Sequence, residues 1–331
     1  MDFTNEKKGD ELGETSEVAR PQGRFTILMV AALVIGESGV VLQLFFNVIK
    51  VEGAIMTSFL QTVVGTALLW CVVRPNLGVE WRLWWRSLAI GGSSVVSLVA
   101  AREAMTLVPY GTITCLAFVF GAMLASLFRI YRAQRWKALG WPFLAGASVF
   151  LLTDGLGMGD LPGLFLIGLV ALAYHVYVTT TSGLQRDEVN TVATLARLPT
   201  VILLTVMLFT AEGPGSLLHV SGQAWWVCSV SGAVGVVALL MINEAWRRGM
   251  TATTHAGAMP ADNLLAIGDG MLVGQQPTPA NLVGAAFVVA SEWGLTKARI
   301  PDGEKTSRFA AWVDDLPARA RAKRNKEKPL G

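Results

Sequence analysis

The chain has little charge and few residues suited to covalent or metal chemistry. Only 15% of its 331 residues are Asp, Glu, Lys or Arg, and 53% are hydrophobic, whereas an average soluble domain has about 25% charged residues. Its three cysteines, Cys71, Cys115 and Cys228, all lie within apolar runs and lack the spacing of a zinc site or a disulfide framework. These shortages argue against a soluble domain, a metal site and a disulfide-stabilised secreted domain.

Enzyme motifs are also missing from the sequence. It contains no phosphate-binding glycine loop followed by lysine, and no legible set of nucleophile, histidine and acid. We therefore expect no enzyme activity, no catalytic residues, no cofactor and no ATP-driven step within this chain. The net charge of +3 resides almost entirely in loops and tails, so the basic clusters do not indicate a nucleic-acid partner.

Long apolar runs account for the missing charge. A helix needs about 20 mostly apolar residues to cross a bilayer, and the runs predict an all-α polytopic membrane protein with ten transmembrane helices. The expected spans are residues 25–46, 53–73, 87–105, 111–128, 138–152, 162–181, 192–210, 224–244, 252–273 and 282–296. Residues 1–24 are polar at their start and have no apolar core or cleavage site, which predicts a cytoplasmic tail rather than a signal peptide.

Basic residues are concentrated in the even-numbered loops. They are Arg74, Arg82, Arg86, Arg129, Arg132, Arg135, Lys137, Arg247 and Arg248. The third, fifth, seventh and ninth loops contain no Lys or Arg, and Lys50 in the first loop is a mild exception. Because Lys and Arg favour the cytoplasmic side, the pattern predicts a multi-pass protein of the plasma (inner) membrane with both termini in the cytoplasm.

A repeat organises the chain. Glu103-Ala104-Met105 and a break at Val108-Pro109-Tyr110 precede an apolar run, and the pattern returns 141 residues later at Glu244-Ala245-Trp246. Residues 25–153 and 162–296 are therefore expected to be two five-helix repeats. Since five is odd, the second repeat is inverted relative to the first, and the substrate site is expected near the midplane between them.

The C-terminal segment, residues 297–331, is basic and is expected to be cytoplasmic. Either it is a solvated tail, or it forms a short helix on the surface of anionic lipid.

The ten-helix inverted repeat and the junctions EAMTLVPYGT and EAWRRGMTAT resemble those of the drug/metabolite transporter superfamily, EamA type. The chain is most similar to threonine/homoserine exporters, on the stretches Val108-Pro109, Asp160-Leu161-Pro162-Gly163, Ala173-Tyr174 and Tyr177. The resemblance covers about residues 25–296 and implies secondary transport of a small metabolite. Gln275-Gln276 and Gln61 depart from the family, which usually has an acidic residue and an arginine there.

Glu37 lies in the middle of the first span and falls near His175 of the sixth in the repeat alignment. Ionisable groups inside a membrane span are costly, so each needs a partner or a function. We expect Glu37 to be a proton or ammonium site, with His175 as relay or hydrogen-bond partner. Alternatively, Glu37 is structural and is satisfied by neighbouring Ser and backbone groups.

The ninth span contains Pro260, Asp262 and Asn263. Proline removes a backbone donor and disturbs the helix, so a kink here would leave the Asp262 carboxylate and the Asn263 amide beside the substrate path. An amino-acid substrate would find there a partner for its ammonium group. Asn263 is open to a second interpretation, as a hydrogen bond between helices.

Other polar residues are weaker candidates. Arg197 is expected either to bind a substrate carboxylate or to extend toward the cytoplasmic boundary. Glu103 and Glu244 recur at matching junctions and suggest a structural role or a gate, and His255 and Asp269 are further pore-lining candidates.

The sequence thus predicts a secondary transporter, a proton-coupled exporter of small amino-acid-like metabolites. Its expected partners are the small-molecule substrate, the lipid bilayer and H+ as coupling ion, and a homodimer is an open alternative to a monomer. Two other functions remain open. One is an exporter of drugs or cationic compounds, and the other is a non-transporting sensor or assembly protein that retains the transporter fold.

Overall fold

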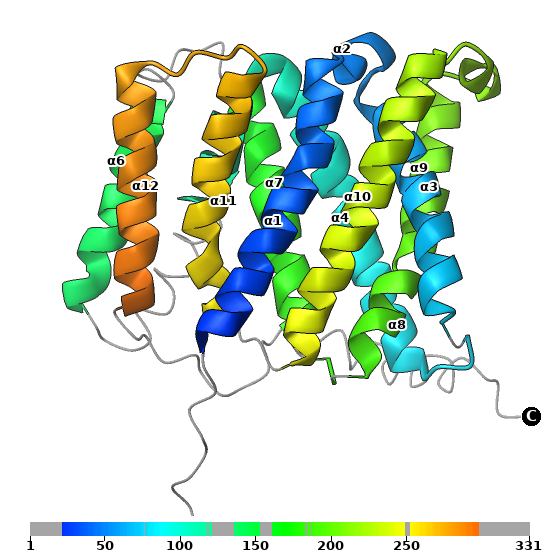
Figure 1. Ribbon diagram of the computed structural model, residues 1–331, viewed down its shortest axis with the longest axis horizontal. Helices are drawn as coiled ribbons and strands as arrows, with labels where there is room; N and C mark the ends of the chain where they lie inside the picture. The colour runs from blue at the N-terminus through cyan, green and yellow to red at the C-terminus, as the bar shows by residue number, and fades with distance from the viewer. Residues whose placement is uncertain are drawn as a thin grey trace, which may run out of the picture.

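The computed structural model describes residues 22–75, 77–117, 119–120, 136–152, 161–182, 184–185, 187–248 and 252–297. This part of the chain is helical and contains no strand (Figure 1). The helices are α1 (Gln22–Phe45), α2 (Val48–Glu52), α3 (Ala54–Val73), α4 (Trp81–Leu107), η1 (Trp136–Leu139), α6 (Gly140–Leu152), α7 (Leu161–Ser182), α8 (Glu188–Leu195), α9 (Arg197–Ala211), η3 (Pro214–Leu218), α10 (Gly222–Arg247), α11 (Ala252–Leu272) and α12 (Pro279–Lys297). Described residues within 110–120 are helical too.

These helices fit a multi-pass membrane protein. Helix occupies part or all of every range expected from the sequence. Within the described residues, six segments are long and apolar enough to cross a membrane: Ile27–Phe45, Ala54–Val73, Trp81–Leu107, Leu161–Thr181, Glu188–Ala211 and Gly222–Arg247. Most of the two expected tails, and the expected basic loop from Arg129 to Arg135, lie outside the described residues.

The start of α4 differs from the sequence-based expectation. Because α4 begins at Trp81, Arg82 and Arg86 belong to the helix and not to the preceding loop. The buried positions Leu83, Arg86 and Ile90 recur at helical spacing, so the helical pattern extends further toward the N-terminus than the apolar run does. The side chain of Arg82 forms an ion pair with Glu188 of α8.

The seventh expected span is interrupted. α8 ends at Leu195, Ala196 forms a turn, and α9 begins at Arg197. Pro199 explains the break, because proline cannot donate to a carbonyl four residues earlier and its ring crowds that carbonyl. The short helix α2 was not expected either. It begins after Asn47, which is in the left-handed conformation (φ 55°), and ends at Glu52, before Gly53 (φ 83°).

The helices stand side by side in an elongated bundle (Figure 1). α6 packs with α12 at one edge and α3 with α9 at the other, while α1 packs chiefly on α10 and α11, and α4 on α7 and α9. We call the two ends of the bundle the α2 end, at the top of Figure 1, and the α8 end, at the bottom. The 212–221 and 273–278 connections lie at the α2 end, and the 74–80 connection lies at the α8 end.

Two glycines allow backbones to meet closely. A Cβ atom on Gly91 of α4 would lie 2.4 Å from the carbonyl oxygen of Ala196, beside α9. A Cβ atom on Gly232 of α10 would lie 2.7 Å from the carbonyl oxygen of Gln61 on α3. Small residues let helices approach in this way, and these two positions are 141 residues apart, the spacing of the repeat.

Candidate functional site

The site begins with the packing of α1 on α10. A Cβ atom on Gly36 would lie 3.5 Å from Ala238 Cβ, and one on Gly39 would lie 3.4 Å from Ser231, so these glycines face α10. Glu37 lies between them and contacts other elements, namely Tyr110 and Asp262 of α11. Gly36 and Gly39 thus face α10, whereas the Glu37 carboxyl group lies on a different face of α1.

Two carboxyl groups and a phenol form the centre of the site. The Tyr110 hydroxyl donates a hydrogen bond to Glu37 Oε2, and the Asp262 carboxyl group is a direct neighbour of the Glu37 carboxyl group. Tyr110 is 5% exposed and Asp262 7% exposed. We call Glu37 and Asp262 the acid pair.

One carboxyl oxygen of the acid pair has no hydrogen bond in the described structure. Asp262 Oδ1 is buried and has no hydrogen-bond partner among the described residues. A buried carboxyl oxygen without a partner is costly in an apolar environment. It is therefore the natural acceptor for a donor that reaches the acid pair from outside the protein, such as an ammonium group or a water molecule.

Tyr110 is held at both ends. It is the first residue of a helix that follows Pro109, so its backbone N–H has no acceptor within that helix. Gln275 Oε1 accepts this N–H at 3.0 Å. Gln275 is placed by the end of α11, where Gly274 adopts φ 86° and the Gln275 N–H donates to the Gly270 carbonyl at 2.9 Å. The backbone and the hydroxyl of Tyr110 are thus fixed by two different partners.

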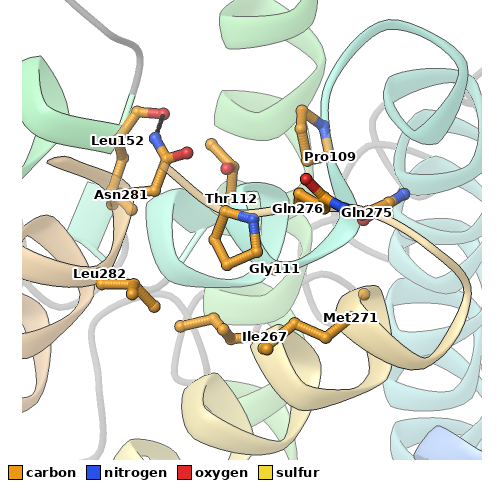
Figure 2. A pocket seen from close by; sticks show the side chains of 12 residues that line it. Pro109, Gly111, Thr112, Leu152, Ile267, Met271, Gln275, Gln276, Asn281 and Leu282 are labelled. Carbon is orange, nitrogen blue, oxygen red and sulfur yellow. Dashed lines mark hydrogen bonds between the residues drawn. The ribbon is translucent and has the colours of Figure 1, made fainter. Parts of the chain in front are cut away.

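A pocket of about 190 Å³, shown in Figure 2, lies at the α2 end of the bundle. Its lining residues are Pro109, Gly111, Thr112, Leu152, Ile267, Gly270, Met271, Gln275, Gln276, Pro277, Asn281 and Leu282. All are uncharged, and the polar groups are three amides and one hydroxyl. Pro109 and Gly111 flank Tyr110 in sequence, so the pocket and the acid pair both neighbour this residue.

Asn281 closes one wall of this pocket and joins α6 to α12. Thr278 and Asn281 cap α12 reciprocally, each backbone N–H donating to the other side chain, at 2.9 and 3.2 Å. Asn281 Nδ2 also donates to the Leu152 carbonyl at 3.1 Å, as Figure 2 shows, and to the Leu151 carbonyl at 3.3 Å. These carbonyls end α6 and have no backbone N–H donor within their own helix.

Among the residues singled out from the sequence, Glu37 and Asp262 are brought together. Asn263 is fully buried beside Asp262. Asp269 is partly buried two turns further along α11, close enough to interact electrostatically with both members of the acid pair. Its Oδ2 atom is buried and has no hydrogen-bond partner in the described structure.

The other sequence candidates lie elsewhere. His175 is exposed on α7, and Glu103 is exposed near the end of α4. Arg197 is partly buried at the start of α9, where Tyr177 of α7 is its electrostatic neighbour. Glu244 pairs with two arginines at the end of α10, Arg247 at 3.0 Å and Arg248, the residue after the helix, at 2.7 Å.

The proline of the ninth span lies within α11, but the side chains of Pro260 and His255 are outside the described set. Within that set, no group of three or more His, Cys, Asp or Glu residues is placed to hold a metal ion.

Sequence reasoning missed Tyr110 and Gln275 as members of the site. Tyr110 stands in the Val108-Pro109-Tyr110 break at the repeat junction, and a proline followed by a helix start was the available signal. The sequence marks Gln275 only as a departure from the acidic residue that is usual in the family that the chain resembles. Its hydrogen bond to Tyr110 depends on the turn at Gly274, which sequence spacing does not reveal.

Comparison with known proteins gives a likeness of fold alone. No protein-family model matches the chain, and no curated protein sequence matches it. A solved structure described as "Crystal structure of protein" is similar over 81% of this chain and 98% of its own length, with a TM-score of 0.54 and 19% sequence identity. At this identity the match shows a shared fold and says nothing of substrate or activity.

Proposed function

We propose that this protein is a secondary transporter, a proton-coupled exporter of small amino-acid-like metabolites. In this proposal ten helices cross the membrane as two inverted five-helix repeats. The observation that carries it is the acid pair, because one carboxyl group comes from α1 in the first half and the other from α11 in the second. Ionisable groups buried inside a membrane bundle are most often part of a substrate or proton path.

The packing of the helices supports the inverted repeat. If α1 corresponds to α7, α3 to α9, α4 to α10 and α6 to α12, the extensive α1–α10 packing has its counterpart in α4–α7. The edge pairs α3–α9 and α6–α12 are then each formed by two equivalent helices. The close approach at Gly91 has its counterpart at Gly232.

The charge distribution supports an orientation with both termini in the cytoplasm. Arg74 follows α3 and Arg247 and Arg248 end α10, all at the α8 end of the bundle, whereas Lys50 lies at the α2 end. With the positive residues inside, the α2 end and its pocket face the exterior. The pocket would then be the outer vestibule of the transport path.

The acid pair offers a simple basis for coupling. A substrate ammonium group and a proton compete for the same carboxyl oxygens, so protonation of the pair from outside releases the ammonium group. Deprotonation toward the cytoplasm restores a negative site for the next substrate. Alternating access between the two halves would expose the pair to each side in turn.

The test is efflux of radiolabelled threonine and homoserine from loaded cells, with and without a collapsed proton gradient. Wild type is compared with Glu37→Gln and Asp262→Asn, and with Glu80→Gln, which changes an exposed carboxyl group outside the site. We expect gradient-dependent efflux in wild type and Glu80→Gln, and at least a tenfold loss in the two acid-pair variants. Equal gradient-dependent efflux in all four proteins would contradict the proposed role of the acid pair.

An exporter of hydrophobic cations is a second candidate. Leu152, Ile267, Met271 and Leu282 contribute apolar side chains to the pocket, and the acid pair could balance a positive charge. Export of labelled tetraphenylphosphonium, lost in Glu37→Gln, together with no threonine or homoserine efflux, would favour this function.

A further inference from the structure

A buried arginine lies in the same bundle with only neutral partners. Arg102 of α4 is 5% exposed. Its Nη1 donates to Ser58 Oγ at 2.9 Å and to the Leu98 carbonyl at 3.4 Å, its Nε donates to Gln43 Oε1 at 3.3 Å, and its Nη2 donates to Gln61 Oε1. All of these acceptors are hydroxyl, amide or backbone oxygens.

The charge of Arg102 is therefore unbalanced within the described structure, where no carboxylate forms an ion pair with it. A guanidinium group does not lose its proton in proteins. Buried charges in proteins are normally paired, because an isolated ion in an apolar environment is very costly. The neutral acceptors satisfy hydrogen bonds but supply no negative charge, so an anion is the missing component.

Gln61 is the partner that can give way to such an anion. Its Oε1 accepts from both Arg102 and Gln43, the latter at 3.0 Å. Its own Nε2 reaches only the Ser231 carbonyl of α10, at the long distance of 3.5 Å. An amide oxygen on a guanidinium group occupies the position that a carboxylate oxygen would take, so Gln61 fills the place of an absent carboxylate.

This arginine is also close to the acid pair. Tyr110, which donates to Glu37, is an electrostatic neighbour of Arg102. Along α1, Gln43 follows Glu37 by six residues, a rise of about 9 Å. Arg102 and the acid pair thus both neighbour Tyr110, at different depths along α1.

We propose that Arg102 binds the carboxylate of the transported metabolite, displacing Gln61 from its guanidinium group. The inference rests on the proposed function in one respect, the identity of the carboxylate as that of an amino-acid-like substrate. The anion site itself stands on the geometry around Arg102. We thus place the substrate carboxylate at Arg102 of α4 rather than at Arg197 of α9, the candidate that the sequence suggested.

The first experiment measures ligand binding without transport. The full-length protein is purified in detergent at constant ionic strength, and its unfolding temperature is followed against L-threonine, L-threoninamide, acetate and chloride, with the bulky sulfonate MES as reference anion. We expect L-threonine to bind at least tenfold more tightly than L-threoninamide, which lacks the carboxylate. In Arg102→Gln this preference should fall to about one, while Lys50→Gln, which removes an exposed positive charge from α2, should keep it.

A second variant keeps the proposal testable if Arg102→Gln fails to fold. Gln61→Glu supplies a carboxylate at the position where the structure has an amide, so it should fold and unfold at a higher temperature than wild type. It should also lose the preference for L-threonine over L-threoninamide, because the built-in carboxylate occupies Arg102. A Gln61→Glu protein that keeps the wild-type preference would overturn the proposal.

The outcomes separate this inference from the proposed function. If acetate or chloride stabilises wild type but not Arg102→Gln or Gln61→Glu, and L-threonine is no better than acetate, the anion site stands and the amino-acid substrate does not. If chloride alone acts, the site holds an inorganic anion and the substrate carboxylate is overturned. If none of the anions acts on wild type, or all act equally on wild type and Arg102→Gln, there is no anion site at Arg102.

Discussion

Replacing Gly91 by alanine is expected to destabilise the folded protein by about 2 kcal/mol. The new Cβ atom would lie 2.4 Å from the Ala196 carbonyl oxygen and 2.5 Å from Pro199 Cγ. Ordinary contacts begin near 3.4 Å, so α4 and α9 would have to separate by about 1 Å. Neither neighbour can rotate away, because one is backbone and the other is a proline ring. The upper part of the overpacking range, about 2–3 kcal/mol, therefore applies.

Two further effects adjust this value. Separating the helices would lengthen the hydrogen bond from Thr200 Oγ1 to the Gly91 carbonyl, now 3.2 Å. Thr200 Oγ1 also bonds the Ala196 carbonyl at 2.8 Å, so its loss leaves no orphaned hydroxyl and costs little. Against this, alanine is favoured over glycine within a helix by about 1 kcal/mol.

Gly92 is the matched control. It is adjacent on the same helix, yet a Cβ atom there would meet nothing within 4 Å. Gly92→Ala should therefore stabilise the protein by up to about 1 kcal/mol through helix propensity alone. The two variants would then differ by about 3 kcal/mol, more than a hundredfold in the unfolding equilibrium.

The assay is unfolding of the purified protein in detergent, by heat or by titration with a denaturing detergent. Gly91→Ala should unfold several degrees below wild type and Gly92→Ala at or above it. Equal unfolding temperatures for the two variants would refute the close packing of α4 on α9.

Three other changes test single contacts. Tyr110→Phe removes the hydroxyl bonded to Glu37; since a hydrogen bond contributes about 1 kcal/mol net, and more where a partner is charged, gradient-driven efflux should fall several-fold. The double variant with Glu37→Gln should be no less active than the less active single variant, and additive losses would count against this contact. Asn281→Ala should lower stability by about 1–2 kcal/mol in detergent unfolding, because the last carbonyls of α6 lose their donor, and an unchanged unfolding curve would count against this capping role. Burial and then the nearby Glu52 carboxylate raise the pKa of Glu212 at the α2 end. Protonation therefore favours the folded state, a benefit present below the ordinary glutamate pKa and lost as pH rises through the raised value. Because Glu212 is largely exposed, Glu212→Gln should stabilise by only about 0.2–0.5 kcal/mol at pH 7.5 and by nothing at pH 4, and an equal gain at both pH values would refute the sign.

The all-α membrane character of the fold could be predicted because long apolar runs admit few other structures. Helix ends were less predictable. The start of α4 lies in a stretch rich in Trp and Arg, where hydropathy falls although the helical spacing of Leu83 and Ile90 continues. The break between α8 and α9 depends on Pro199, whose effect within an apolar run ranges from a mild kink to a full interruption.

The members of the acid pair could be named one at a time, since each is a carboxylate in an apolar run. Their meeting could not be predicted, because Glu37 and Asp262 are 225 residues apart and the contact depends on how α1 and α11 are rotated against each other. The absence of a carboxylate partner for Arg102 in the described structure could likewise not be predicted. Sequence spacing places it near a helix end, where an arginine usually reaches water, whereas the structure buries it among Gln43, Ser58 and Gln61.

The connection between α11 and α12 has a practical consequence for labelling the protein. Gly274 makes the turn, Gln275 spans from the Gly270 carbonyl to the Tyr110 N–H, and Thr278 caps the next helix. Val273, Gly274, Gln275 and Thr278 each form hydrogen bonds that depend on the length and order of this short loop. An epitope or fluorophore inserted here would shift these partners out of register, so this loop is a poor place for a reporter despite its position on the surface.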